Sequence, residues 1–253
     1  MRLNVGPQPI PNPIINEGGV VSSATYTPTL APGSLGAVFG FLLGGPEGGV
    51  NTSFGGRRGD QLPNVVEGVK VLALDPFGNV IAECPLLYLS PHQINFQLPY
   101  DVFGRTAVWI VVENSGIRSE PQQITVQSSA PGIFKTDTGY AVAQNQNGLL
   151  NSDANPLGDG QVLTVYCTGP GVVAPAWASG RAAPAFHPVR VPSPTTVTIG
   201  GVPATIQFIG LAPGMVGVGQ LNIYAGDGTP SGKQTLLITI NGFMSNPADV
   251  AIQ

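Results

Sequence analysis

Apolar and polar residues alternate along residues 90–99, which read S-P-H-Q-I-N-F-Q-L-P. Ile94, Phe96 and Leu98 occupy every second position, and amide side chains stand between them. Successive side chains of a β-strand point to opposite faces, so this period of two predicts a strand with one buried and one polar face.

The same pattern returns about half a chain later in residues 219–224, G-Q-L-N-I-Y. Three further short matches keep the same order in both halves. The matched pairs are residues 33–35 with 160–162, 93–96 with 220–223, 116–121 with 242–247, and 123–127 with 249–253. One short match is expected by chance, whereas an ordered series at a nearly constant offset indicates an internal duplication.

Short apolar segments separated by glycine and proline run through the whole chain. Residues 69–74 and 80–89 flank the turn sequence D-P-F-G-N and predict a hairpin. No stretch of ten residues has the apolar spacing of an amphipathic helix. We therefore expect an all-β protein of two tandem immunoglobulin-like β-sandwich domains, residues 20–128 and 129–253, each with about seven short strands.

Residues 1–19 differ from the rest, because prolines alternate with other residues between positions 7 and 13. Alternating prolines favour an extended backbone that has no core of its own. We expect an extended proline-rich N-terminal arm, which lies along its own domain or reaches a neighbouring copy. Its candidate anchors are Ile10, Ile14 and Ile15.

Charge is sparse along the chain, which has 253 residues, a net charge of −4 and only 9% charged residues. Ten lysines and arginines in total leave no basic stripe, so we expect no nucleic-acid partner. No apolar run approaches the length of about 18 residues that a membrane helix needs, so we expect no membrane span. A surface with little charge repulsion suits a subunit that packs against copies of itself.

The two cysteines, Cys84 and Cys167, lie in different halves of the chain. A disulfide between them would have to bridge the halves, and the sequence does not give their distance. The alternative is a pair of thiols that pack as small apolar side chains. No cysteine or histidine cluster indicates a metal site.

Residues for catalysis are few. His92 and His187 are the only histidines, and no G-x-S-x-G motif accompanies them, so a Ser-His-Asp triad has no support. Asp153 and Asp159 share a loop whose oxygens could hold calcium, but asparagine, aspartate and glycine in loops usually form turns. We expect no catalytic, metal-binding or cofactor-binding residue, and therefore no enzyme.

Aromatic side chains matter for sugar binding, because their rings stack on sugar faces. Trp177 lies in the loop sequence A-P-A-W-A-S-G and is the candidate sugar platform, with Tyr100, Tyr224 and Phe186 as companions. Trp109 alternates with apolar residues inside a strand pattern, which favours a position in a core or between domains.

Five motifs together resemble a known family. They read A-P-G-S-L, L-Y-L-S-P-H-Q-I-N-F-Q-L-P, A-P-G-I-F, T-V-T-I-G-G-V-P-A-T-I-Q-F-I-G-L-A-P-G and S-N-P-A-D-V-A-I-Q. Over residues 20–253 the chain is similar to the uncharacterised Solibacter-type C-terminal domain family of acidobacterial exported proteins. The resemblance implies a secreted or surface location and immunoglobulin-like, TIG-like modules. It implies no activity and no catalytic residues.

Two functions follow as hypotheses. The first is a non-catalytic extracellular structural protein that self-associates, as a filament or surface-layer subunit whose arm adds a strand to a neighbour. The alternative is an adhesion or carbohydrate-binding module, with cell-surface polysaccharide as its partner. Both place the protein outside the cell or on its surface.

Overall fold

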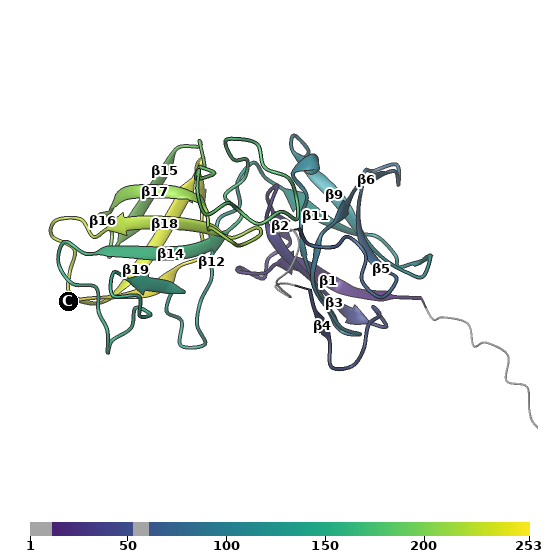
Figure 1. The fold of residues 1–253 in the computed structure, drawn as a ribbon, viewed down its shortest axis with the longest axis horizontal. Helices are drawn as coiled ribbons and strands as arrows, with labels where there is room; N and C mark the ends of the chain where they lie inside the picture. The colour runs from purple at the N-terminus through teal and green to yellow at the C-terminus, as the bar shows by residue number, and fades with distance from the viewer. Residues whose placement is uncertain (1–11, 53–60) are drawn as a thin grey trace, which may run out of the picture.

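The computed structural model describes residues 12–52 and 61–253 and has two β-sandwiches side by side along its long axis (Figure 1). The described chain contains strands, turns and one short 3₁₀ helix, η1 (Tyr100–Val102). The expected all-β class with two tandem immunoglobulin-like sandwiches is confirmed. The C-terminus lies at the far end of the second sandwich (Figure 1).

The first sandwich consists of two mainly antiparallel sheets. One sheet has the order β1 (Ile14–Ser22), β3 (Leu35–Phe41), β8 (Gln93–Gln97), β7 (Leu86–Leu89) and β4 (Val50–Asn51). The other has the order β2 (Thr29–Leu30), β11 (Gln122–Val126), β9 (Ala107–Asn114), β5 (Val69–Leu74) and β6 (Val80–Cys84), with β10 (Ile117–Arg118) paired to β9.

The second sandwich repeats this plan. One sheet has the order β12 (Gly132–Ile133), β14 (Val162–Thr168), β18 (Gly219–Tyr224) and β17 (Thr205–Leu211), with β13 (Ala143–Asn145) also paired to β14. The other has the order β16 (Val202–Pro203), β15 (Thr195–Ile199), β19 (Gly232–Ile240) and β20 (Phe243–Met244), with β21 (Ala248–Ile252) on β19.

The register of the strands repeats as well as their order. Leu30 pairs in parallel with Val126 in the first sandwich, and Leu157 pairs in parallel with Ile252 in the second. In both halves a two-residue strand, β10 or β20, folds back on the long strand before it. Since these features recur at matched positions, the internal duplication extends to the three-dimensional fold.

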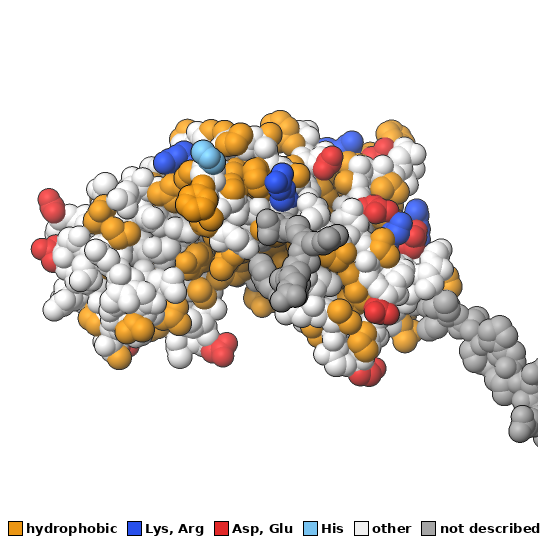
Figure 2. Space-filling model, in the orientation of Figure 1, with side chains coloured by type: hydrophobic (Ala, Val, Ile, Leu, Met, Phe, Trp, Pro, Cys, Tyr) orange, Lys and Arg blue, Asp and Glu red, His pale blue; other side chains and the backbone are white. Residues whose placement is uncertain are grey.

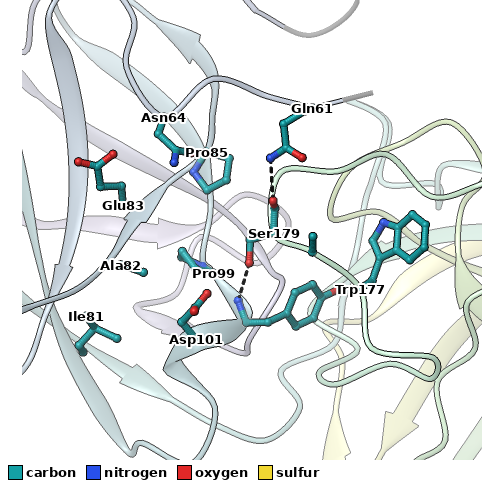
Figure 3. A pocket seen from close by; sticks show the side chains of 12 residues that line it. Gln61, Asn64, Ile81, Ala82, Glu83, Pro85, Pro99, Asp101, Trp177 and Ser179 are labelled. Carbon is teal, nitrogen blue, oxygen red and sulfur yellow. Dashed lines mark hydrogen bonds between the residues drawn. The ribbon is translucent and has the colours of Figure 1, made fainter. Parts of the chain in front are cut away.

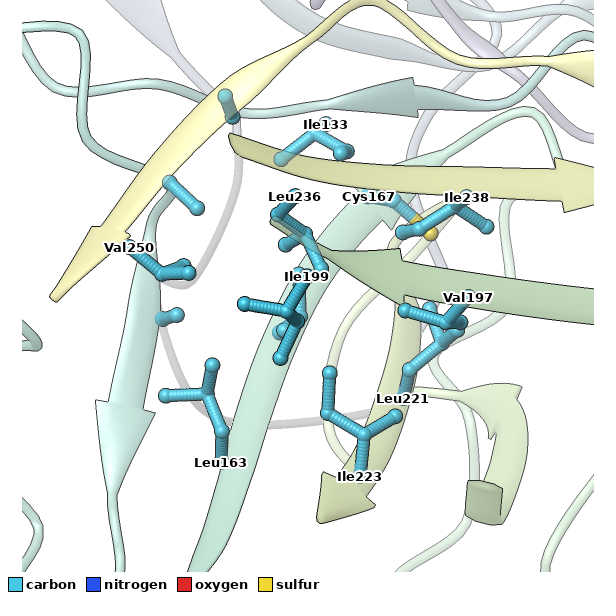
Figure 4. Close-up of a cluster of buried hydrophobic side chains, with 14 of the residues drawn as sticks. Ile133, Leu163, Cys167, Val197, Ile199, Leu221, Ile223, Leu236, Ile238 and Val250 are labelled. Carbon is cyan, nitrogen blue, oxygen red and sulfur yellow. The ribbon is translucent and has the colours of Figure 1, made fainter. Parts of the chain in front are cut away.

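Alternation in the sequence decides which side chains form the cores. Ile94 and Phe96 of β8 are fully buried in the first core, and Leu221 and Ile223 of β18 are fully buried in the second. In Figure 4 the labelled side chains of the second core come from both sheets and point toward one another. The period of two in residues 90–99 therefore predicted the buried face correctly.

Residues 14–19 take the first of the two positions expected for the arm, along their own domain. These residues begin β1, which pairs with β3 of its own sandwich, so they belong to the first domain. Ile15 lies in the core, whereas Ile14 is 52% exposed at the end of the strand. The apolar side chain of Ile15 and the open edge of β3 are both satisfied within the chain. Ile10 lies outside the described residues.

Hydrogen bonds connect the two sandwiches directly. The Leu35 amide donates to the Thr168 hydroxyl oxygen at 2.8 Å, and that hydroxyl donates to the Gly217 carbonyl at 2.9 Å. Near the connecting segment, the Ala130 amide donates to the Gly169 carbonyl at 2.9 Å. The strand ends of one sandwich therefore form part of the surface on which the other rests.

Most of the visible surface is uncharged (Figure 2). The charged side chains lie in small groups, and few of them are on the face of the second sandwich toward the viewer. Among the described residues, no helix is long and apolar enough to cross a membrane.

Candidate functional site

A pocket of about 660 Å³ opens where the two sandwiches meet. The first sandwich contributes Gln61, Asn64, Glu83, Tyr100 and Asp101, among others, and the second contributes residues 177–179. Figure 3 shows that the labelled residues of the first sandwich and the loop that carries Trp177 and Ser179 approach from opposite sides.

The loop between β14 and β15 closes one side of the pocket by bonding to the first sandwich. The Ser179 hydroxyl accepts the Tyr100 amide at 2.9 Å, and the Ser179 carbonyl accepts the Gln61 side-chain amide at 2.9 Å (Figure 3). Next to it, the Gly180 carbonyl accepts the Leu62 amide at 2.8 Å. These bonds place Trp177 beside a sandwich to which it does not belong.

Gly180 is required at this contact. Its φ of +76° is a left-handed conformation that costs glycine little, and a Cβ here would lie 2.6 Å from the Gln61 side-chain nitrogen. The buried Gln97 side chain accepts the Gly180 amide at 2.5 Å and donates to the Gly33 carbonyl at 3.2 Å. The loop is therefore fixed by backbone and side-chain bonds together.

Trp177 is half-buried, with one part of the indole in contact with the second core. Its ring nitrogen donates to the Arg181 carbonyl at 3.0 Å, and the Arg181 guanidinium lies 4.8 Å from the ring centroid. This cation–π contact fixes the ring. The indole can offer a bound molecule only the part of its surface that faces the pocket.

Tyr100 supplies a second ring from the first sandwich. Burial raises the pKa of its phenol to about 12, so the hydroxyl stays protonated at neutral pH. A neutral phenol both donates and accepts hydrogen bonds.

The polar lining is acidic and amidic. Glu83 forms an ion pair with Lys70 at 2.7 Å, and this hydrogen bond raises the pKa of the Lys70 ammonium. Asp101 is exposed at the mouth. Among the described lining residues there is no lysine, arginine or histidine, and the carboxylate and amide oxygens can accept hydrogen bonds from hydroxyl groups.

The residues considered for catalysis lie apart from the pocket. His92 packs edge-on against Phe41 with centroids 5.7 Å apart, and His187 is exposed in a loop. Asp153 accepts a hydrogen bond from the Tyr140 hydroxyl, which raises the pKa of Tyr140 to about 12. Within residues 12–52 and 61–253, no three histidine, cysteine or acidic side chains are grouped to hold a metal ion.

The other aromatic candidates are scattered. Phe186 is 81% exposed in the loop before β15, and Tyr224 lies at the end of β18. Trp109 packs against a small buried cluster of Leu72, Leu74 and Val111, separate from the main core of the first sandwich. Alternation puts Trp109 on the opposite side of β9 from the buried Val108 and Ile110.

Sequence reasoning identified Trp177 and Tyr100 but missed the polar lining. Gln61, Asn64, Glu83 and Asp101 come from separate segments of the first sandwich, and none stands in a motif. They meet only because the loop between β14 and β15 crosses to that domain, and no local pattern in the sequence indicates this crossing.

Comparison with known proteins gives no family. No family model matches the chain, and no curated protein matches it. The resemblance to the Solibacter-type family therefore stays a prediction.

Several solved structures are similar to this chain at low sequence identity. Two are SGBP-B proteins, one from a complex xyloglucan utilization locus in Bacteroides uniformis and one from a Bacteroides ovatus mixed-linkage glucan utilization locus in complex with a mixed-linkage heptasaccharide. The first has 13% identity over 95% of this chain and 49% of that one, with a TM-score of 0.27. The second has 11% identity over 96% of this chain and 45% of that one, with a TM-score of 0.38.

A third similar structure is the I9–I11 tandem from titin, with 11% identity over 96% of this chain and 65% of that one and a TM-score of 0.22. The chain thus spans about half the length of the two SGBP-B proteins. Overlaps this weak carry no argument about binding.

Proposed function

We propose that this protein is a non-catalytic carbohydrate-binding protein, extracellular or on the cell surface, that binds a saccharide in the pocket between its sandwiches. The observation that carries the proposal is that Tyr100 and Trp177, from different domains, share one pocket with amide and carboxylate side chains. Ligand sites usually have volumes of about 300–1,000 Å³ and combine apolar surface with a few polar groups.

The chemistry of the lining fits a neutral sugar. The rings offer apolar surface to the C–H face of a sugar, and Asp101, Gln61 and Asn64 can bond to its hydroxyl groups. An acidic sugar would meet the carboxylates of Glu83 and Asp101 with no cation among the described lining residues, which is unfavourable.

Self-association has lost part of its support. The strand that was to be donated to a neighbour is, from Ile14 onward, already paired with β3 of the same chain. Filament or surface-layer assembly through Ile10 stays a prediction, since that residue lies outside the described part.

Calorimetric titration with neutral oligosaccharides, preceded by a glycan array, tests the proposal. We expect Trp177→Ala to weaken binding at least tenfold, or about 1.4 kcal/mol. Trp109→Ala is the matched control, because it removes the same half-exposed side chain outside the pocket. Asp101→Ala, an exposed change that does not threaten folding, should also weaken binding. Equal affinity in the wild type and both pocket variants would refute the site.

A further inference from the structure

The outer face of the sheet formed by β13, β14, β18 and β17 carries an ordered row of uncharged polar and aromatic side chains. Alternate residues of these strands are half-buried and face away from the core. The six that form the row are Gln144, Thr164, Tyr166, Gln220, Asn222 and Tyr224. We call them the polar face.

The strand register brings these side chains next to one another. Thr164 pairs with Gln144 on one side and with Asn222 on the other, and Tyr166 pairs with Gln220. Directly paired residues on one face of antiparallel strands have Cβ atoms about 5 Å apart, so their side chains are in contact range.

Hydrogen bonds fix the orientation of the polar face. The Tyr166 hydroxyl donates to the Gln144 side-chain oxygen at 3.1 Å. The Asn222 side-chain oxygen accepts the Gln220 amide at 2.9 Å and the Thr164 hydroxyl at 3.3 Å. These bonds use the side-chain oxygens of Gln144 and Asn222. The NH₂ groups of Gln144 and Asn222 can therefore donate outward, and so can the second amide hydrogen of Gln220.

An aromatic ring bounds the polar face on β17. Phe208 pairs with Asn222, and its ring lies over Gly210, where a Cβ would be 2.6 Å from a ring carbon. The guanidinium of Arg190 lies 5.1 Å from the centroid of this ring. Glycine at position 210 thus makes room both for the Val189 carbonyl, 2.3 Å from a Cβ position, and for a flat ring beside the row of amides.

The polar face has no charged side chain of its own. Figure 2 shows the same neutrality on the viewer's side of the second sandwich, where β14, β18 and β17 run in Figure 1. Fixed amides, hydroxyls and rings without charge complement a ligand that is rich in hydroxyl groups and itself uncharged. A nucleic acid, an acidic peptide or an anionic polymer would find no countercharge apart from Arg190 at the edge.

We propose that the polar face binds a neutral polysaccharide chain laid across the strands. The polar face spans three strands, about 10 Å at a spacing of about 4.8 Å, and the Phe208 ring on β17 extends it to about 14 Å, the length of a short oligosaccharide. This site differs from the pocket between the sandwiches in position and residues, and it stands whether or not the pocket binds a sugar.

The first sandwich provides an internal comparison. There Gln93 donates to Asn95 at 2.7 Å, so the paired amides are conserved in the duplication. In the first sandwich Asn95 pairs with Ala37, whereas in the second the matching Asn222 pairs with Thr164. The other neighbour of Asn95 is Tyr88, and the loop at Gly49 lies against the Tyr88 ring. This face has fewer hydrogen-bonding groups and is partly covered, so binding belongs to the second sandwich.

Affinity electrophoresis tests the proposal. The gels contain a soluble neutral β-glucan, a neutral galactomannan or the anionic polygalacturonate. We expect retardation by at least one neutral polymer and none by polygalacturonate. Tyr166→Ala and Asn222→Ala should weaken the retardation about tenfold, whereas the matched change Asn95→Ala and the pocket change Trp177→Ala should leave it in place.

A nuclear magnetic resonance titration keeps the proposal testable if a variant fails to fold. In the wild type, the side-chain amide signals of Gln220 and Asn222 should shift with an oligosaccharide of the retained polymer, and those of Gln93 and Asn95 should not. Unshifted signals, retardation that survives in Tyr166→Ala and Asn222→Ala, or no retardation by any neutral polymer would overturn it. Loss in Trp177→Ala alone would support the pocket and overturn the polar face.

Discussion

Cys84 and Cys167 are fully buried, each in the core of a different sandwich, and both are free thiols. The disulfide that the sequence left open is therefore absent, because each side chain packs inside its own domain. Burial disfavours the thiolate, so it raises the pKa of both thiols, that of Cys167 to about 12. Both behave as small apolar side chains.

We expect neither thiol to react with a thiol-specific disulfide reagent in the native protein at pH 8, because the thiolate is the reactive species and neither sulfur is accessible. Two equivalents should react in denaturant. Rapid labelling of the native protein would contradict the buried positions.

The amide pairs show what the sequence could and could not predict about single residues. The alternation correctly indicated that Gln93 and Asn95 share the polar side of a strand. Their partners could not be read from it: Gln93 bonds to Asn95, and Gln220 bonds to Asn222, along the same strand. A period of two gives the face of a side chain, but not the rotamer that selects its partner.

At the level of elements, the two-residue strands β10 and β20 show the duplication in detail. Ser119 follows β10, and its hydroxyl accepts the Val112 amide at 3.1 Å and donates to the Glu120 carbonyl. Ser245 follows β20, and its hydroxyl accepts the Ile238 amide at 3.0 Å. Each serine thus satisfies a buried backbone group at the point where the chain leaves the long strand.

We expect Ser119→Ala and Ser245→Ala each to lower the free energy of unfolding by about 1–3 kcal/mol, because a buried amide is left without an acceptor. Chemical denaturation measures the effect. Ser115→Ala, an exposed change in the same hairpin as Ser119, is the control and should cost less than about 0.5 kcal/mol. Losses of unfolding free energy equal to that of the control would show that water replaces the hydroxyl.

Element boundaries at the N-terminus could not be predicted. Prolines up to position 13 suggested one continuous arm, whereas β1 starts at Ile14, directly after the last of them. The register shift between Ile15 and Val20 hides the alternation of β1, because an irregular strand loses its period of two. The pairing was decided by the open edge of β3, which no pattern within residues 14–22 indicates.

At the scale of the molecule, the sequence predicted two sandwiches but not how they meet. The contact between them uses Gln61, Gln97 and Ser179. Gln97 lies in the strand pattern of residues 90–99, but that pattern gives no sign of a partner in the other sandwich. The candidate pocket exists only through this contact, so its lining could not be predicted either. Alternating apolar residues reveal the strands of each domain, whereas the residues of an interface between domains follow no periodic pattern.

Gln97 is the residue whose change best tests the union of the two sandwiches. It is 2% exposed, accepts the Gly180 amide at 2.5 Å and donates to the Gly33 carbonyl at 3.2 Å. Leucine at this position keeps the volume but removes both bonds. Gln97→Leu should therefore destabilise the protein by about 1–3 kcal/mol, since the Gly180 amide loses its buried acceptor.

The same change should uncouple the domains. In scanning calorimetry we expect the wild type to unfold in one transition and Gln97→Leu to show two, because the loop that joins the second sandwich to the first is released. Gln123→Leu, on the exposed face of β11, should keep the single transition. Saccharide affinity in the pocket should fall with Gln97→Leu, since the bonds that place Ser179 and Trp177 depend on the same loop. A single transition with unchanged affinity would mean that the remaining bonds between the sandwiches suffice to hold them together.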